Sequence, residues 1–196
     1  MITIIDYGLG NLFSLKSSLE FLGASVEVTA DKAKIASAEK IILPGVGAFG
    51  DAMAKLRELG LEETIVAAAR AGTPLMGICL GMQLLFDESE EYGPHAGLSL
   101  ISGTVKKLQV THKIPHMGWN RLHFNAACPL LNDVDEGSYV YYVHSFYAEG
   151  ETAVAYSDYG TKVAGVVANG NVYGTQFHPE KSGEVGLKIL KNFCEL

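Results

Sequence analysis

Four short apolar runs, separated by segments of helical length, occupy the first part of the chain. They span residues 2–5, 25–29, 40–43 and 75–78. Leucines recur at helical spacing after the first run until Gly23 is placed to end the helix, and residues 51–71 predict one or two helices interrupted at Gly60. Residues 80–86 predict a further helix. Strands that alternate with helices predict a mainly parallel sheet with helices on both faces.

The second part of the chain is rich in Val, Tyr and Thr and contains several turn signals. Residues 98–124 and 138–177 predict hairpins and antiparallel strands, and residues 182–194 predict a closing amphipathic helix. No repeat, low-complexity tract or linker interrupts the chain. We therefore expect one domain over residues 1–196, a three-layer α/β fold with an antiparallel extension.

Composition and charge exclude several classes of function. Hydrophobic residues make up 48% of the chain and charged residues 19%, which is typical of a globular protein and not of a disordered one. The net charge of −7 and the absence of Lys or Arg runs disfavour nucleic-acid binding. Cys79, Cys128 and Cys194 are too widely spaced for a disulfide framework or a zinc site, and free thiols favour a reducing compartment. The sequence has no recognisable signal peptide or membrane-spanning run, so we expect a cytoplasmic protein. It also has no recognisable metal cluster or phosphate loop, and we expect no metal or cofactor.

Residues 77–81 read Gly-Ile-Cys-Leu-Gly and lie between a predicted strand and a predicted helix. This is the layout of a nucleophile elbow, in which a sharp turn strains the backbone of the nucleophile and requires small neighbours. A helix N-terminus contributes only about 0.3–1 kcal/mol, less than one pKa unit, so Cys79 needs a basic partner for strong activation at neutral pH. The alternative is that Cys79 is a small buried core residue, as free cysteines often are.

The segment His178-Pro179-Glu180 supplies a candidate base. Residues two apart in an extended segment project to the same side, and Pro179 favours an extended conformation at His178. The Glu180 carboxylate can therefore bind one ring nitrogen of His178 and leave the other to face the Cys79 thiol. Alone, this segment would be an ordinary strand end with a solvated glutamate, and its combination with Cys79 is what favours a catalytic triad.

Acyl transfer also requires hydrogen-bond donors for the developing oxyanion, each worth about 3 kcal/mol. The backbone N–H of Leu80, directly after Cys79, is one expected donor. The second is expected from Val46 and Gly47 in the loop of residues 44–47, Pro-Gly-Val-Gly, because glycines ease the reorientation of peptide planes. Taken alone, this loop is an ordinary strand-ending turn.

Together these segments resemble the class I, or triad, glutamine amidotransferases over essentially the whole chain. The matching residues are 77–83, Gly-Ile-Cys-Leu-Gly-Met-Gln, and the later His178-Pro179-Glu180. Within the class, the chain is most similar to the glutaminase subunits of imidazole glycerol phosphate synthase. That narrower resemblance rests on residues 6–11, 44–47, 115–120, 142–146 and 178–182. It implies a flavodoxin-like three-layer fold, in agreement with the alternation of strands and helices.

The resemblance also implies a reaction and a set of substrate contacts. Cys79 would attack the side-chain amide of L-glutamine, release ammonia and form a glutamyl thioester, which water then hydrolyses to glutamate. Gln83 and Glu91 would hold the amino-acid end of the substrate, together with the backbone of Ser145 and Phe146. The residues alone support these contacts less well, because Gln83 also fits a solvated helix position and Glu91 an exposed helix end.

Free ammonia in water at neutral pH becomes ammonium, which is not a nucleophile, so an ammonia source needs an acceptor site beside it. The chain has no recognisable second site, and the resemblance implies a separate (β/α)8-barrel cyclase as heterodimer partner. That cyclase would form imidazole glycerol phosphate and AICAR in histidine biosynthesis, and the Val46 peptide would complete the oxyanion hole only when the partner is loaded. Trp119 is of a type enriched at interface hot spots, although a core aromatic is the alternative. The candidate interface residues are Asn11, Trp119, Tyr141 and Lys181.

Three other functions are open from the sequence. One is the glutaminase of a different synthase, serving vitamin B6, purine or anthranilate synthesis, although the segments around Val46 and Trp119 argue against it. Another is a cysteine peptidase or stress-response hydrolase on the same elbow, which would need neither Gln83 nor the His-Pro-Glu segment. The third, an inactive regulatory module, is disfavoured by the intact set of triad residues.

Overall fold

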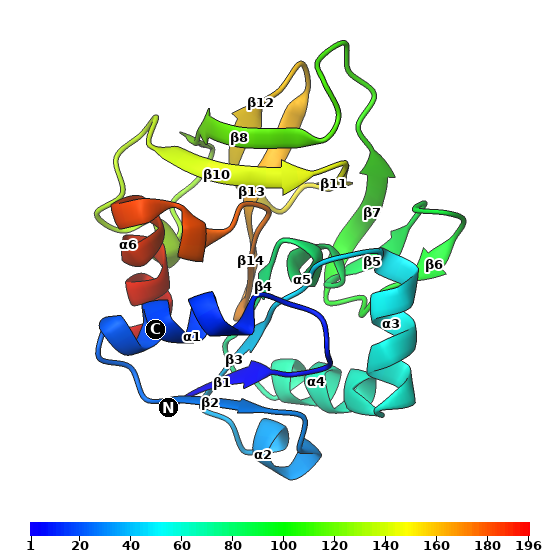
Figure 1. Cartoon of the computed structure of the whole chain (residues 1–196), viewed down its shortest axis with the longest axis vertical. Helices are drawn as coiled ribbons and strands as arrows, with labels where there is room; N and C mark the ends of the chain where they lie inside the picture. The colour runs from blue at the N-terminus through cyan, green and yellow to red at the C-terminus, as the bar shows by residue number, and fades with distance from the viewer.

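The computed structural model describes every residue from 1 to 196 (Figure 1). Its largest sheet has eight strands in the order β2-β1-β3-β4-β14-β13-β12-β9. The first five of these are parallel to one another, and the last three are joined by antiparallel pairing. The predicted parallel sheet and its antiparallel extension are therefore confirmed. The strands are β1 (Ile2–Ile5), β2 (Val26–Thr29), β3 (Lys40–Leu43), β4 (Leu75–Ile78), β9 (His123–Phe124), β12 (Ala153–Asp158), β13 (Lys162–Asn169) and β14 (Val172–Thr175).

Helices cover both faces of this sheet because side chains alternate along each strand. Ile4 of β1 belongs to the core that contains Leu19 of α1 and Phe193 of α6. Its neighbour Ile5 belongs to the opposite core, with Leu56 of α3. Figure 1 shows α1 and α6 to the left of the central strands and α3 to the right. The helices are α1 (Leu12–Phe21), α2 (Lys32–Ala36), α3 (Phe49–Glu58), α4 (Leu61–Arg70), α5 (Leu80–Gln83) and α6 (Gly183–Cys194), with 3-10 turns η1 (Pro129–Leu131) and η2 (Pro179–Lys181).

Two smaller sheets complete the fold. One has four strands in the order β11-β7-β5-β6, formed by β5 (Phe86–Ser89), β6 (His95–Ala96), β7 (Ile101–Lys107) and β11 (Phe146–Glu149). The other is a two-stranded ribbon of β8 (His116–Arg121) and β10 (Tyr139–His144). The backbone N–H of His178, beyond β14, donates to the carbonyl oxygen of Tyr141 in β10 at 3.0 Å. The ribbon therefore passes over the carboxyl end of β14, as Figure 1 shows.

The structure corrects the predicted α-helices at two places. The helix expected over residues 80–86 ends at Gln83, because the carbonyl oxygens of Leu84 and Leu85 bond the backbone of residues 98–101 and so lead the chain into β5. The short helix α2 was not predicted, and the Asp31 side chain caps it by accepting from the first-turn N–H groups. None of the helices combines the length and the apolar character that a membrane crossing requires.

Candidate active site

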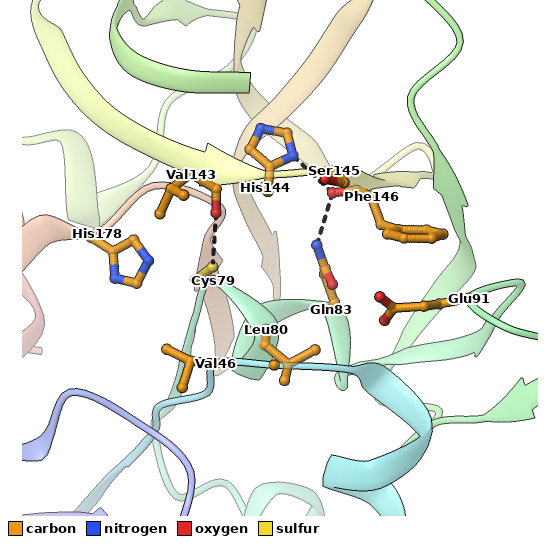
Figure 2. Close-up of a pocket in the computed structure, with 11 residues that line it drawn as sticks. Val46, Cys79, Leu80, Gln83, Glu91, Val143, His144, Ser145, Phe146 and His178 are labelled. Atoms are coloured by element: carbon orange, nitrogen blue, oxygen red, sulfur yellow. Dashed lines mark hydrogen bonds between the residues drawn. The ribbon is translucent and has the colours of Figure 1, made fainter. Parts of the chain in front are cut away.

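A cavity of about 370 Å³ opens beside the carboxyl end of β4 (Figure 2). The main-chain segment of Val143 and His144, at the end of β10, forms part of its wall. Nowhere in the chain do three or more His, Cys, Asp or Glu side chains gather as a metal-binding group. The cavity is lined by nine of the residues that the sequence predicts for the site: Val46, Gly47, Cys79, Leu80, Gln83, Glu91, Ser145, Phe146 and His178.

Cys79 occupies the turn between β4 and α5 in a backbone conformation that few non-glycine residues adopt. Its φ is 55° and its ψ is −113°, and strain of this kind costs of the order of 1–3 kcal/mol. A Cβ at Gly77 would lie 2.5 Å from the carbonyl oxygen of Gly81, and a Cβ at Gly81 would lie 1.9 Å from that of Leu43. Both glycines are therefore required by close approach of the backbone. Because α5 is only four residues long, its terminus adds little to activation of the thiol.

His178 and Glu180 form a buried pair. Nδ1 of His178 lies 2.9 Å from Oε1 of Glu180, and neither side chain is more than 4% exposed. The second carboxylate oxygen of Glu180 is buried without a hydrogen-bond partner, so the His178 ring is the only donor to this carboxylate. Burial alone would lower the pKa of His178, but hydrogen bonding and charge from Cys79 and Glu180 overcome burial and raise that pKa well above its usual range. The raised pKa favours the protonated form of the ring, and the hydrogen bond to Glu180 fixes the orientation of the ring.

The Cys79 sulfur lies among polar groups from β10 and from the segment after β14. It is 3.9 Å from the carbonyl oxygen of Val143 and 3.8 Å from Nε2 of Gln176. The His178 ring lies beside the sulfur on another side (Figure 2). The sulfur is therefore placed to attack an electrophilic carbonyl group, with the His178 ring beside it to transfer a proton.

The loop of residues 44–47 is fixed at its start and open at its end. The buried hydroxyl of Tyr7 donates to the carbonyl oxygen of Pro44 at 2.8 Å, and a Cβ at Gly45 would lie 2.8 Å from that hydroxyl. Val46 is 42% exposed, and Gly47 has a φ of 100° with open space around it. The residues predicted for the oxyanion hole therefore lie in the part of the loop that has room to reorient.

The far side of the cavity carries the residues predicted to bind substrate. Gln83 is 4% exposed, and its Nε2 donates to the carbonyl oxygen of Phe146 and to Oε1 of Gln176, each at 2.9 Å. Glu91 is 8% exposed, and its Oε2 accepts from the backbone N–H of Phe49 at 2.7 Å. The solvated helix position considered for Gln83 and the exposed helix end considered for Glu91 are therefore wrong.

The four candidate interface residues lie at or near the surface, outside the cavity. Trp119 is 56% exposed and is therefore not a core aromatic. It lies opposite Tyr141 in the β8–β10 ribbon, with the two rings edge to face at 6.0 Å. Lys181 is exposed in η2, and Asn11 is half-buried just before α1, without capping it through its side chain.

Sequence reasoning missed three groups that contact the predicted site. Gln176 bonds both Gln83 and the thiol, and its position two residues before His178 on an extended segment was the available signal. His144 lies on the buried face of β10 together with Val140 and Tyr142. Tyr7 braces the loop at Pro44 through a contact that only the fold creates, and no local pattern announces it.

Comparisons with known proteins identify the family of the chain. The sequence profile of the family "Glutamine amidotransferase class-I" matches residues 3–196. Imidazole glycerol phosphate synthase subunit HisH of Bacillus thuringiensis (strain Al Hakam) is 54% identical over 195 residues, which are 98% of this chain and 93% of that protein. The subunit of the same name from Bacillus anthracis (strain A0248) is 53% identical over the same shares of both chains.

Solved structures show the same fold at low sequence identity. A crystal structure described as a glutamine amidotransferase superimposes with a TM-score of 0.77 at 19% identity, covering 99% of this chain and all of the other. The PurLQS structure from Thermotoga maritima gives a TM-score of 0.76 at 24% identity, over 99% and 97% of the two chains. The chain belongs to the class I glutamine amidotransferases and, within that family, to the HisH subunits of imidazole glycerol phosphate synthase.

Proposed function

We propose that this chain, as one glutamine amidotransferase domain over residues 1–196, hydrolyses L-glutamine to glutamate and ammonia on Cys79. Ammonia passes to a cyclase subunit, which forms imidazole glycerol phosphate and AICAR in histidine biosynthesis. The observation that carries the proposal is the strained Cys79 facing the buried His178–Glu180 pair across one wall of a cavity. Identity of 54% to a HisH subunit over nearly the whole chain supports the choice of pathway.

The proposed chemistry begins from a Cys79 thiolate beside a protonated His178 ring. The Cys79 thiolate attacks the side-chain carbonyl carbon of glutamine, and the carbonyl oxygen becomes an oxyanion. Backbone N–H groups of Leu80 and of the Val46–Gly47 segment stabilise that oxyanion. The His178 imidazolium gives its proton to the departing nitrogen, the C–N bond breaks and ammonia leaves, and the glutamyl group remains on Cys79 as a thioester. The neutral ring then takes a proton from water, whose attack on the thioester releases glutamate and restores the thiolate.

Two side chains and one main-chain segment give this cavity its proposed preference for glutamine. The Glu91 carboxylate pairs with the α-ammonium group of the substrate. Both amide hydrogens of Gln83 are used inside the protein, so its Oε1 is the atom left to accept from that ammonium group. The carbonyl oxygen of Phe146 is also occupied, and Ser145 and Phe146 contribute through their remaining backbone groups and the Phe146 ring.

The proposed partner is the cyclase subunit, bound as a heterodimer. Trp119 and Tyr141 present an exposed aromatic pair on the β8–β10 ribbon, and aromatic side chains are enriched at interface hot spots. Lys181 adds a polar group from η2, which packs against β10, and Asn11 adds one just before α1, which packs against η2. Three free thiols fit a reducing compartment, and we place the protein in the cytoplasm.

The test is glutamate release from L-glutamine by the purified chain, alone and with the cyclase and its nucleotide substrate. We expect weak release alone and strong release in the mixture, with the Cys79→Ala chain inactive in both. Strong release that ignores this cyclase but responds to another synthase would keep the glutaminase and reject the pathway. Peptide cleavage without glutamine hydrolysis would reject the amidotransferase chemistry.

A further inference from the structure

Two buried histidines outside the proposed catalytic pair contact each other. His116 of β8 and His144 of β10 face each other in the ribbon, and Nδ1 of His116 lies 2.9 Å from Nε2 of His144. They are 2% and 6% exposed, respectively. The rings of Tyr142 and Tyr159 stack on His116, with centroid distances of 4.5 Å and 3.9 Å. Packing therefore fixes the plane of the His116 ring, and neither histidine takes part in the proposed chemistry.

Hydrogen-bond partners determine which nitrogen of each ring carries the proton. Nδ1 of His144 lies 2.8 Å from the carbonyl oxygen of Phe146, which can only accept, so His144 must donate from Nδ1. Burial lowers the pKa of both rings, of His116 to about 4 and of His144 to about 3, so both are neutral at neutral pH. Nε2 of His144 is then a bare acceptor, and His116 must donate to it from Nδ1.

The same logic extends the chain of donors at its outer end. Nε2 of His116 is left as an acceptor, and the side-chain amide of Asn120 lies 3.3 Å from it. Asn120 follows the exposed Trp119 in β8. Every bond in this series therefore points the same way, from the exposed ribbon toward the cavity.

At its inner end this series of hydrogen bonds reaches the cavity. The Phe146 carbonyl accepts from His144 and from Gln83 at the same time, so both of its lone pairs are used. Gln83 also bonds Gln176, whose amide contacts the Cys79 sulfur. A shift of the Phe146 carbonyl would therefore move Gln83, the residue proposed to hold the amino-acid end of the substrate.

We propose that His116 and His144 are positioning residues, a one-directional hydrogen-bond relay that holds the Phe146 carbonyl and thereby the glutamine-binding side of the cavity. The proposal rests on the proposed function, because it names residues that prepare that substrate site. It predicts a larger defect in substrate binding than in the chemical step, since the relay ends on the carbonyl group that Gln83 bonds, whereas the His178–Glu180 pair bonds no member of the relay.

Protonation of the two rings can be measured on the unmodified chain, without any activity assay. Two-bond ¹H–¹⁵N NMR correlations of the labelled protein at about pH 7 identify the protonated nitrogen of each ring. We expect both His116 and His144 as neutral Nδ1–H tautomers. An Nε2–H tautomer or an imidazolium at either position would overturn the relay, whatever the enzyme proves to hydrolyse.

Substitutions in this chain then test the role of the relay, with each variant assayed in complex with the cyclase. His144→Leu removes the donor and the acceptor and fills the buried site with an apolar side chain. We expect KM for glutamine to rise about tenfold with kcat changed less than about threefold. His144→Asn keeps an amide donor near the position of Nδ1, and we expect it to recover most of the loss. The control is His123→Leu, at a half-exposed histidine far from the cavity, which should leave KM unchanged. A loss confined to kcat, or equal losses in the two His144 variants, would reject a positioning role.

The proposal also requires that the two histidines act through the same path. His116→Phe keeps a flat ring between Tyr142 and Tyr159 but cannot donate to His144. We expect it to raise KM on its own and to add nothing in the His144→Leu background, because both variants break one path. Additive effects would show that the two residues act separately. If the wild-type complex itself hydrolysed no glutamine, the proposed function would fail, while the NMR measurement would still decide whether the relay exists.

Discussion

The carboxylate of Glu91 accepts a hydrogen bond from the backbone N–H of Phe49 at 2.7 Å, across 42 residues of sequence. Phe49 is the first residue of α3, and the preceding Ala48 offers no side chain to cap that helix. Glu91 therefore caps α3 from a distance and at the same time lines the cavity. A negatively charged side chain at this position also complements the partial positive charge of the helix N-terminus.

Glu91→Gln tests the proposed recognition of the substrate ammonium group. The amide oxygen can still accept from the Phe49 N–H, so the cap and the fold should persist, while the negative charge is lost. We expect KM for glutamine to rise by about 10- to 100-fold with a smaller change in kcat, because a charge-assisted bond contributes about 1.5–3 kcal/mol. The neighbouring exposed Glu90 is the matched control, and Glu90→Gln should leave KM unchanged. An unchanged KM in Glu91→Gln would place the ammonium group elsewhere.

Cys79→Ala should separate the two halves of the proposed reaction. Without the thiol no thioester forms, and glutamine hydrolysis should fall to background. Synthesis by the complex from added ammonium salts should persist, because the acceptor chemistry is proposed to lie in the partner. Steady-state assays with each nitrogen source measure both outcomes. Loss of the ammonia-driven reaction as well would contradict this division of labour.

The His178–Glu180 pair predicts graded losses. His178→Ala removes the group that transfers the proton, and we expect turnover to fall by about 10⁶-fold. Glu180→Gln leaves the imidazole and removes only its orienting charge, so the loss should be roughly 100-fold smaller. Single-turnover measurement of thioester formation would compare them. Equal losses would mean that Glu180 does more than orient the ring.

Gly81→Ala tests the packing of the elbow. The added Cβ would lie 1.9 Å from the carbonyl oxygen of Leu43, a contact that β3 or α5 must move to relieve. We expect a loss of at least about 3 kcal/mol in the free energy of unfolding, the upper range for overpacking. Gly170→Ala is the control, since Gly170 has a φ of 60° with nothing near its Cβ position. Its cost should be limited to about 1–2 kcal/mol of left-handed strain, and equal costs in urea unfolding would refute the steric argument.

The buried histidines predict that stability falls with acid before the carboxylates titrate. Burial lowers the pKa of His116 to about 4 and that of His144 to about 3, whereas both rings in the unfolded chain take up protons near about pH 6.5. The unfolded state therefore binds more protons between these limits, and the free energy of unfolding should fall by up to about 2.7 kcal/mol per pH unit as the pH drops below about 6.5. His178 acts in the opposite direction at about pH 6.5, because its raised pKa keeps it protonated in the native state while the unfolded ring is only partly protonated, and this opposing change ends once the unfolded ring is protonated as well.

Urea midpoints between about pH 7 and about pH 5 measure this slope. The double variant His116→Phe/His144→Leu has no titrating group at these positions, so its slope should be much flatter. If the double variant kept the wild-type slope, the acid sensitivity would come from other groups.

The elbow was predictable from the sequence because its requirements are local. A turn within one residue strains Cys79 and leaves no room for a Cβ at Gly77 or Gly81, so the constraints all fall within residues 77–81. The pairing of His178 and Glu180 was also predicted, but the extended segment expected there ends at His178, and Glu180 lies in the 3-10 turn η2. The fold class followed from strand and helix periodicity for the same reason.

Contacts between distant segments were not predictable in the same way. Gln176 meets Gln83 across 93 residues only because β14 pairs with β4. Glu91 is buried because the chain leaves α5 after one turn and pairs as β5, which the helical pattern of residues 80–86 concealed. His144 acquires its role from the register of β8 against β10, which no single-segment pattern specifies.

The position of β14 also sets the order in which the molecule can become complete. β14 is the last strand along the chain, yet it lies in the interior of the eight-stranded sheet, between β4 and β13. A chain emerging from the ribosome can form β1 to β4 early, but β4 keeps an open edge until residues 172–175 arrive, and His178 follows three residues later. The proposed nucleophile therefore has no imidazole beside it until residue 178 has been made, and a shorter nascent chain lacks the His178–Glu180 pair of the proposed site.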